Sequence, residues 1–177
     1  MSAENQKRLH DIADGETFCP TGLTTTWIKL YEIDGWAIAV TESLWDFGRF
    51  DTKSNLLSNS QILNRLTSEL LPVLESGVGA DNMLKFKTDL LALDGTYHGH
   101  VMESKISLHT IDMYRYFRHA FDKHMPEDWW WLATPDSEQM QFVTTVCYNG
   151  TIYAVRSGQN RGGIRPLCIF NSNISVL

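Results

Sequence analysis

The sequence has little cysteine, which limits the kinds of site it can build. Its three cysteines, Cys19, Cys147 and Cys168, are an odd number and lie far apart. This pattern excludes a C-x-x-C metal pair and argues against a disulfide framework. Cys147 and Cys168 fall inside predicted strands, where a thiol usually acts as a small buried hydrophobe rather than as a nucleophile. We therefore expect reduced thiols in the core.

Long hydrophobic runs are also missing. No apolar stretch approaches the ~18 residues that predict a membrane span. The opening Met-Ser-Ala-Glu-Asn-Gln-Lys-Arg has a basic pair but none of the apolar segment that a secretory signal needs. We therefore expect no membrane partner and a cytoplasmic protein, in the host cytoplasm if a phage encodes it.

Basic residues are outnumbered, with 15 Lys and Arg against 21 Asp and Glu, a net charge of −6 and a pI near 5.4. Nucleic-acid affinity rests on clustered cations, so this composition argues against a nucleic-acid partner. With 43% hydrophobic and 20% charged residues, the chain is not intrinsically disordered. We expect one folded domain over residues 1–177, with residues 1–8 as a flexible N-terminus.

Two hairpins are predicted, one near each end of the chain. Alternating β-branched and aromatic residues at 24–33 and 36–40 flank an Asp-Gly turn, and those at 141–148 and 151–155 flank an Asn-Gly turn. Both dipeptides are strong hairpin signals. A final strand is expected over residues 167–170.

Helices are predicted between these hairpins. Apolar residues at three- and four-residue spacing over 62–74 indicate an amphipathic helix, with a capping box that begins at Ser58 and with Gly77 and Gly79 at its end. A second helix is expected over 110–123. Terminal strands that form a sheet, with two helices from the middle of the chain, predict an α+β domain.

No catalytic motif is evident: the sequence contains no P-loop, G-x-G-x-x-G, G-x-S-x-G or H-E-x-x-H. The best metal candidate is His98-Gly99-His100, whose imidazoles would share one face of a strand. It lacks further ligands in register, so a solvated loop is the favoured interpretation. Glu127 and Asp128 are adjacent and would point apart. We expect no catalytic residues, no metal and no cofactor.

The run Trp129-Trp130-Trp131 is the most unusual local feature. In an extended chain Trp130 points to one face and its neighbours to the other. We expect Trp130 and Trp131 in the core, whereas the pattern leaves Trp129 open between a core and an exposed position. Downstream, Pro166 suits the first residue of a strand, and Arg165 is expected to anchor the preceding loop through backbone carbonyls, with the Trp pair beneath it.

The hairpin and Gly-rich loop before Arg165 have the composition of a protein-binding patch, because Tyr and Arg supply rigid contacts and Asn and Gln supply hydrogen bonds. The expected partner-binding residues are Tyr148, Tyr153, Arg156, Gln159, Asn160 and Arg161.

These segments resemble a bacterial and phage domain family of unknown function. Residues 130–135, W-W-L-A-T-P, and 163–167, G-I-R-P-L, around the Asn-Gly turn resemble its ending W-W-L-R-S-P … D-G … G-V-R-P-A-L. Residues 9–18 and 27–30 resemble its opening L-x-D-I-x-x-G-D-x-F and its W-I-V-L strand. Ala133 departs from the family, which has Arg there.

That family is similar to the C-type-lectin-like fold of formylglycine-generating enzymes and of the variable proteins of diversity-generating retroelements. The resemblance therefore implies a single C-type-lectin-like domain. The catalytic cysteine pair of the formylglycine-generating enzymes has no counterpart here, and neither has the calcium signature of sugar-binding lectins.

Three hypotheses follow for function. The first is a non-enzymatic protein-binding module, because the resemblance implies a ligand surface between W-W-L and G-x-R-P. In addition to the six residues above, this stretch contains Thr134, Asp136, Glu138 and Gln141. The second is a small acidic phage-encoded inhibitor of a bacterial defence enzyme. The third is a metal-dependent enzyme acting through His98 and His100.

Overall fold

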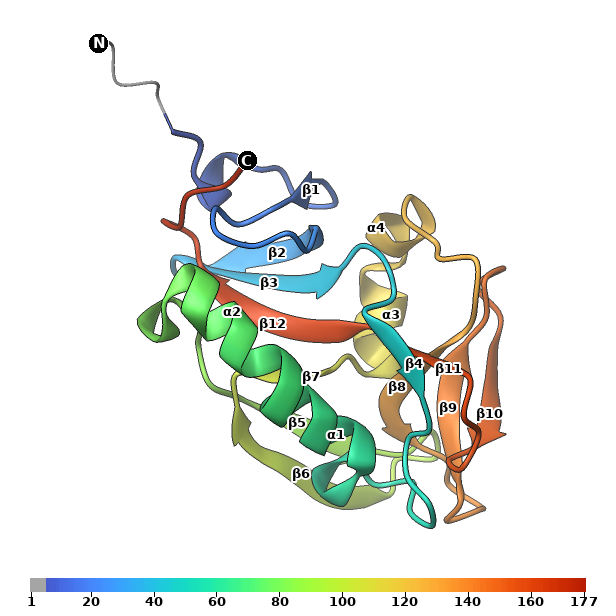
Figure 1. The fold of residues 1–177 in the computed structure, drawn as a ribbon. Helices are drawn as coiled ribbons and strands as arrows, with labels where there is room; N and C mark the ends of the chain where they lie inside the picture. Colours follow the sequence, from blue (N-terminus) through green and yellow to red (C-terminus); the bar gives the residue numbers. More distant parts are fainter. Residues whose placement is uncertain (1–5) are drawn as a thin grey trace, which may run out of the picture.

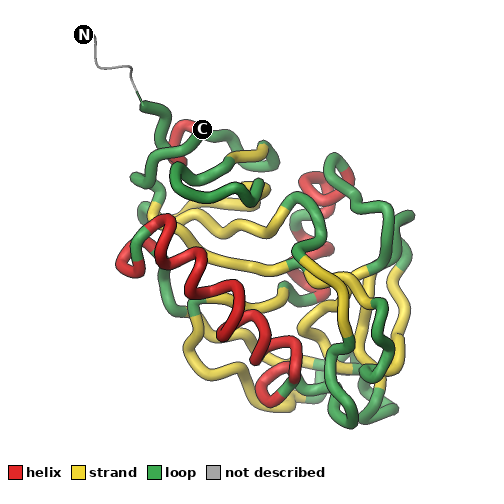
Figure 2. Tube along the Cα trace, in the orientation of Figure 1, coloured by secondary structure: helices red, strands yellow, loops and turns green. Residues whose placement is uncertain are grey.

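The computed structural model describes residues 6–177 and confirms a mixed α+β protein dominated by strands (Figures 1 and 2). Its first sheet contains strands from both ends of the chain, as expected. The order is β1 (Thr17–Phe18), β2 (Trp27–Ile33), β3 (Trp36–Thr41), β12 (Pro166–Asn171) and β7 (Ile106–Leu108). The predicted Asp-Gly hairpin forms β2 and β3, and Asp34 adopts a positive φ of 50° in its turn.

A second sheet packs beside the first (Figure 1). Its order is β10 (Ile152–Arg156), β9 (Phe142–Val146), β8 (Trp130–Pro135), β11 (Gly162–Ile164) and β4 (Asp46–Gly48). The Asn-Gly hairpin is confirmed as β9 and β10, which pair antiparallel.

A third, two-stranded sheet was not predicted from the sequence. It consists of β5 (Phe86–Leu91) and β6 (Tyr97–Ser104). Residues 98–100, expected in a loop, lie inside β6, and Gly99 has a positive φ of 86°. Register shifts interrupt the pairing twice, so the sequence alternation is too irregular to reveal these strands.

The predicted helix over 62–74 is a rod of three pieces that crosses the first sheet (Figure 1). These are α1 (Gln61–Arg65), a π-helical turn η3 (Leu66–Leu70) and α2 (Leu71–Val78). The capping prediction at Ser58 was wrong: the helix starts after Ser60, whose hydroxyl accepts the Leu63 N–H at 3.1 Å. Gly79, with φ 86°, ends the rod. Short 3₁₀ turns lie at η1 (Leu9–Asp11), η2 (Leu57–Asn59) and η4 (Ala80–Asn82).

The second predicted helix is broken. It forms α3 (Ile111–Tyr116) and α4 (Arg118–Asp122), and Phe117 between them has non-helical φ and ψ of −98° and 22°. At the break Phe117 packs against Tyr31, with ring centroids 6.4 Å apart. Tertiary packing has therefore overridden a helical pattern that continues through Phe117.

The N-terminal segment was expected to be flexible over residues 1–8. Residues 1–5 lie outside the described part of the chain, whereas residues 7 and 8 are hydrogen-bonded to the C-terminal segment. The carbonyl of Lys7 accepts the Val176 N–H at 3.0 Å, and Arg8 Nη1 donates to the carbonyl of Asn173 at 2.8 Å. The two ends of the described chain thus close against each other.

Strand alternation in β8 divides the core between two clusters. Trp130 and Trp131 are both fully buried, and they point to opposite faces of the sheet as predicted. Trp131 packs edge-on against Phe50, with centroids 5.7 Å apart, and its indole N–H donates to the carbonyl of Gly48 at 2.9 Å. Trp130 packs instead against Tyr114 of α3.

Arg165 lies where the chain passes from β11, in the second sheet, to β12, in the first. Its side chain is fully buried. Nε donates to the carbonyl of Thr41 at 2.9 Å, and Nη2 donates to those of Glu42 and His124 at 3.0 and 2.9 Å. Arg165 thus binds backbone carbonyls as expected, but they belong to residues 41–42 and 124 and not to the preceding loop, so the predicted anchoring of that loop was wrong. Pro166 opens β12 as predicted.

His109 is buried close to Arg165. Its Nε2 accepts the Trp130 indole N–H at 3.1 Å. Because indole can only donate, the neutral imidazole carries its proton on Nδ1. Burial, and then the nearby charge of Arg165, lower the pKa of His109 to about 3.

We predict that Trp131→Ala lowers the free energy of unfolding by ~3–5 kcal/mol, because it empties a core site and leaves the Gly48 carbonyl without its indole donor. Urea denaturation measures the loss. Trp129→Ala is the matched control and should cost less, since Trp129 is only partly buried. An unchanged midpoint for Trp131→Ala would contradict the placement of this side chain.

The buried His109 also predicts acid sensitivity. Its pKa is depressed in the folded state, so between pH ~6.5 and ~3 the unfolded chain binds a proton that the folded chain does not. The free energy of unfolding should fall by ~2 kcal/mol between about pH 7 and pH 5 from this group. Chemical denaturation at both values should show the fall in the wild type and a smaller one in His109→Gln. An equal fall in both would contradict the assignment.

Candidate functional site

The second sheet carries a hollow of about 600 Å³ at the end where β4, β8 and β11 meet. Phe47, Asp128, Trp129, Asn160 and Arg161 line it. Phe47 is 47% exposed, and the half-buried Trp129 packs edge-on against Trp131 with centroids 4.9 Å apart. This first hollow therefore offers two aromatic surfaces beside one guanidinium, one amide and one carboxylate.

The backbone around the first hollow is fixed by close packing. Gly163 donates its N–H to the carbonyl of Trp129 at 3.0 Å. A Cβ on Gly163 would lie 2.8 Å from that same oxygen, so a larger residue would force the strands apart. At Gly162 a Cβ would lie 2.0 Å from the Trp131 indole nitrogen. These two glycines let the loop that carries Asn160 and Arg161 pass closely over the Trp residues.

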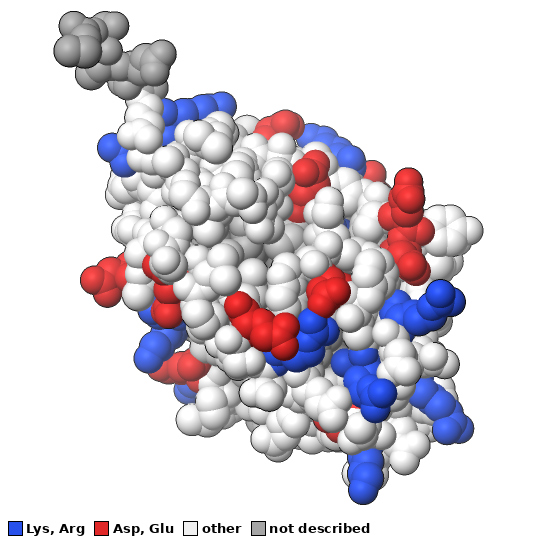
Figure 3. All heavy atoms as spheres, viewed as in Figure 1, with Lys and Arg blue, Asp and Glu red and all other residues white. Residues whose placement is uncertain are grey.

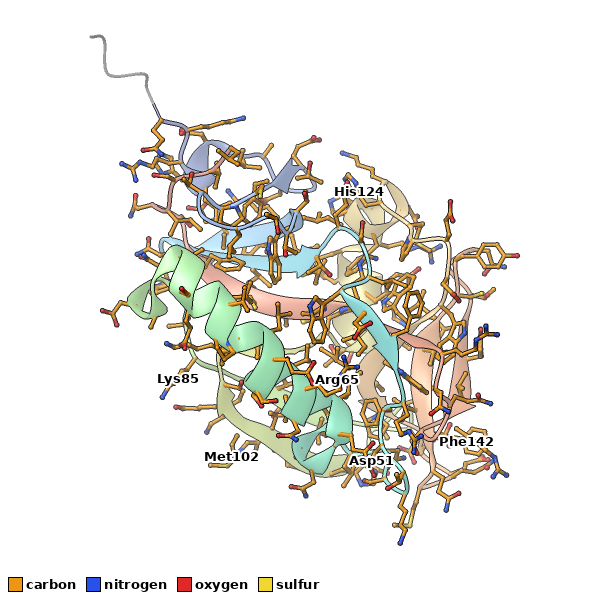
Figure 4. The ribbon with its side chains drawn as sticks, in the orientation of Figure 1. Asp51, Arg65, Lys85, Met102, His124 and Phe142 are labelled. Atoms are coloured by element: carbon orange, nitrogen blue, oxygen red, sulfur yellow. The ribbon has the colours of Figure 1, made fainter. Side chains whose placement is uncertain are left out.

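Arg65 holds the opposite wall of the first hollow. From α1 it forms an ion pair with Asp46 and donates to the carbonyl of Phe47 at 3.3 Å. Its guanidinium also lies 5.3 Å from the ring centroid of Trp45. Figure 4 shows Arg65 on the helix that faces β4. The helix thereby fixes the strand that presents Phe47.

A second hollow of about 320 Å³ lies along the same loop. It is lined by Thr52, Gln141, Arg156, Ser157, Gly158 and Gln159. The buried carbonyl of Ser157 accepts the N–H groups of Phe50 and Asp51 at 2.9 and 3.1 Å, and the Ser157 N–H donates to the carbonyl of Gln141 at 2.8 Å. Residues 49–54 and 157–161 are therefore joined through the backbone.

We call the surface formed by residues 49–54 and 156–161, together with Phe47 and Trp129, the loop face. Figure 3 shows Lys and Arg side chains gathered over the region where Figure 1 places β4 and β9–β11. The loop face carries Arg49, Lys53, Arg156 and Arg161, all of them exposed.

Asp51 stiffens the loop face. Its carboxylate accepts the N–H groups of Lys53 and Ser54, each at 3.0 Å, and that of Gln61 at 3.3 Å. Burial opposes ionisation, but these backbone donors outweigh it and lower the pKa of Asp51. The carboxylate thus ties residues 51–54 to the start of α1 (Figure 4).

The structure brings together four of the six predicted binding residues. Asn160 and Arg161 line the first hollow, and Arg156 and Gln159 line the second. Tyr153 points away from Arg156, because residues an odd number apart on a strand face opposite sides. Tyr148 lies at the other end of the hairpin, before the Asn-Gly turn.

Tyr153 is nonetheless near Asp128, which lines the first hollow. Burial raises the pKa of Tyr153, and neighbouring Cys147 and the Asp128 carboxylate raise it further. Its cross-strand partner is Thr145, which in turn pairs with Trp131. Tyr153 thus lies on the Trp131 side of the sheet.

Sequence reasoning missed residues 47–54 as part of the site. They contain no motif and lie far in sequence from residues 157–161, and the hydrogen bonds of Ser157 that join them depend on the folded sheet. The alternation of the Trp run indicated only that at least one of its indoles is exposed or lies in a groove, and it gave no indication of residues 47–54.

The other candidate groups lie elsewhere. His98 is exposed, and His100 Nδ1 lies 3.2 Å from the Tyr97 hydroxyl. Within residues 6–177 no group of three or more His, Cys, Asp and Glu side chains is placed to hold a metal ion. Burial raises the pKa of Cys168 well above its ordinary value, so this thiol stays protonated.

A larger polar hollow of about 780 Å³ adjoins the loop face. It lies between residues 42–47 and 123–128 and shares Phe47 and Asp128 with the first hollow. His124 Nδ1 lies 3.2 Å from a Glu42 carboxylate oxygen on its wall. Its charged lining is Glu42, Glu127 and Asp128 with one cation, Lys123, so carboxylates predominate there, in contrast to the loop face.

No protein-family model matches the chain, and no curated protein or solved structure matches it either. In the part of the chain that the structure describes, no helix has the length and apolar character needed to cross a membrane.

We predict that Asp51→Ala loosens the loop face. Three backbone N–H groups lose their carboxylate acceptor, which we expect to cost about 1 kcal/mol. Limited trypsin digestion followed by mass spectrometry should show faster cleavage after Lys53 than in the wild type. Asp94→Ala is the matched control, because Asp94 accepts the Thr96 N–H in an exposed turn far from this loop in sequence. Equal cleavage after Lys53 in both variants would contradict the role of Asp51.

Proposed function

We propose that this chain is a non-enzymatic protein-binding module whose partner docks on the loop face. The observation that carries the proposal is the pair of hollows along one rigidly joined pair of loops. Both hollows are flanked by exposed Arg side chains, and one also contains Trp129 and Phe47. Arg and aromatic side chains that project from a fixed backbone are typical anchors of protein interfaces.

The chemistry of the hollows supports binding rather than catalysis. Among their lining residues, Asp128 is the one carboxylate, and neither hollow contains a histidine or a cysteine. General acid–base and nucleophilic catalysis need such groups within hydrogen-bond reach of one another. His109 and Cys168 are enclosed in the core, where they stabilise packing.

The proposed architecture is a C-type-lectin-like domain. Two features support it: the chain ends share the first sheet, and the stretch between W-W-L and G-x-R-P lies in the second. In the retroelement proteins that the sequence resembles, the corresponding stretch forms the ligand surface. Arg156, Gln159, Asn160 and Arg161 lie within it.

We predict that Arg156→Ala combined with Arg161→Ala leaves folding intact and weakens partner binding by ~2 kcal/mol or more, because interface energy concentrates in a few such anchors. Affinity capture from a lysate of the source organism, with quantitative mass spectrometry, compares this variant with the wild type. Lys85→Ala combined with Lys87→Ala is the control, since both side chains are exposed on or beside β5.

At least one protein should be captured by the wild type and the control but not by the loop-face variant. Near-identical melting temperatures for all three proteins would show that the loss is not caused by unfolding. If every captured protein binds the loop-face variant as well as the wild type, the loop face is not the interface.

A further inference from the structure

Among the described residues, the cations of the loop face form no ion pair, and neither do Lys85 and Lys87, which makes those two lysines a matched control. Elsewhere Lys29 pairs with Glu32, Lys105 with Glu75, Arg118 with Asp122 and Lys123 with Glu16, and Arg65 pairs with two carboxylates. Within residues 6–177, none of Arg49, Lys53, Arg156 and Arg161 lies within ion-pair distance of a carboxylate. Asp51 and Asp128 lie on or beside the loop face, but neither is within ion-pair distance of these cations, and the Asp51 carboxylate is bound instead by backbone N–H groups.

The fold holds these cations close together. Gly48 pairs with Gly162 across β4 and β11, so Arg49 and Arg161 leave the ladder at the same end. The backbone bonds of Ser157 place Arg156 beside the loop that carries Lys53. Like charges held on neighbouring segments repel each other, and Asp51 prevents the loop from relaxing away.

The surroundings of the cations favour carboxylate ligands. A guanidinium binds a carboxylate through two parallel hydrogen bonds. Gln141, Gln159 and Thr52 beside Arg156 add side chains that can hydrogen-bond the same ligand. The rings of Trp129 and Phe47 provide an apolar surface next to Arg161.

We infer that the partner of the loop face is a protein surface on which Asp and Glu side chains flank an apolar residue. This inference rests on the proposed function and adds the chemistry of the partner. The carboxylates pair with Arg156, Arg161, Arg49 and Lys53, and the apolar residue occupies the first hollow.

A nucleic acid fits the same cations less well. Its evenly spaced phosphates need a continuous cationic track. Here Asp128 lies inside the first hollow beside Arg161. The charged lining of the adjoining hollow is Glu42, Glu127 and Asp128 against the single cation Lys123, which is itself paired with Glu16. A protein surface can place its charges at separate points and leave these carboxylates uncontacted.

The test selects short random peptides by display on the immobilised protein. Peptides that also bind the loop-face variant Arg156→Gln/Arg161→Gln are removed. In a parallel control selection, the peptides removed are those that bind Lys85→Gln/Lys87→Gln. The first selection should enrich peptides with two or more Asp or Glu residues around an apolar residue. By fluorescence anisotropy these peptides should bind the loop-face variant about tenfold more weakly than the wild type, and more weakly at about 300 mM than at about 50 mM salt.

The outcomes separate this inference from the proposed function. Loop-face-dependent peptides without acidic residues would overturn the inference and leave the binding function standing. Peptides that bind the loop-face variant and the wild type equally would count against both. Single-stranded or duplex DNA oligonucleotides that bind the wild type, with loss in the loop-face variant, would overturn the protein partner in favour of a nucleic acid.

Discussion

The guanidinium of Arg165 lies at the point where the chain leaves one sheet and enters the other. Burying a charge in a protein core is costly unless hydrogen bonds and polarisable neighbours compensate it. Here three backbone carbonyls accept from it, and the rings of Phe121 and Trp130 lie about 5 Å from its central carbon. Burial lowers the pKa of Arg165 to about 9, which leaves the side chain charged at neutral pH. The side chain thereby contacts both sheets, through the Thr41 carbonyl at the end of β3 and through the Trp130 ring of β8.

The candidate site lies next to Arg165 along the chain. Residues 162–164 immediately precede Arg165, and their pairing with β4 brings residues 157–161 against residues 49–54. Gly162 and Gly163 allow this approach over Trp131 and Trp129. The loop face is thus positioned by the core beneath it, which is the arrangement that keeps binding groups ordered before a partner arrives.

Local patterns were enough to predict part of this architecture. The turn dipeptides predicted both hairpins, and strand alternation predicted that Trp130 and Trp131 point to opposite faces. The missing N–H of Pro166 predicted the start of β12. The break at Phe117 and the contribution of residues 47–54 were not predictable, because each depends on contacts between residues distant in sequence. The β5–β6 hairpin is local, and it was missed because register shifts make its alternation irregular. Strand alternation also separated Tyr153 from Arg156, which composition alone could not reveal.

Hydrogen–deuterium exchange on the free and partner-bound protein tests the loop face most directly. Amides of residues 49–54 and 157–161 should exchange more slowly in the complex, while those of the β5–β6 sheet and of α3 and α4 should be unchanged. Protection confined to the β5–β6 sheet or to α3 and α4, with residues 157–161 unaffected, would contradict the account.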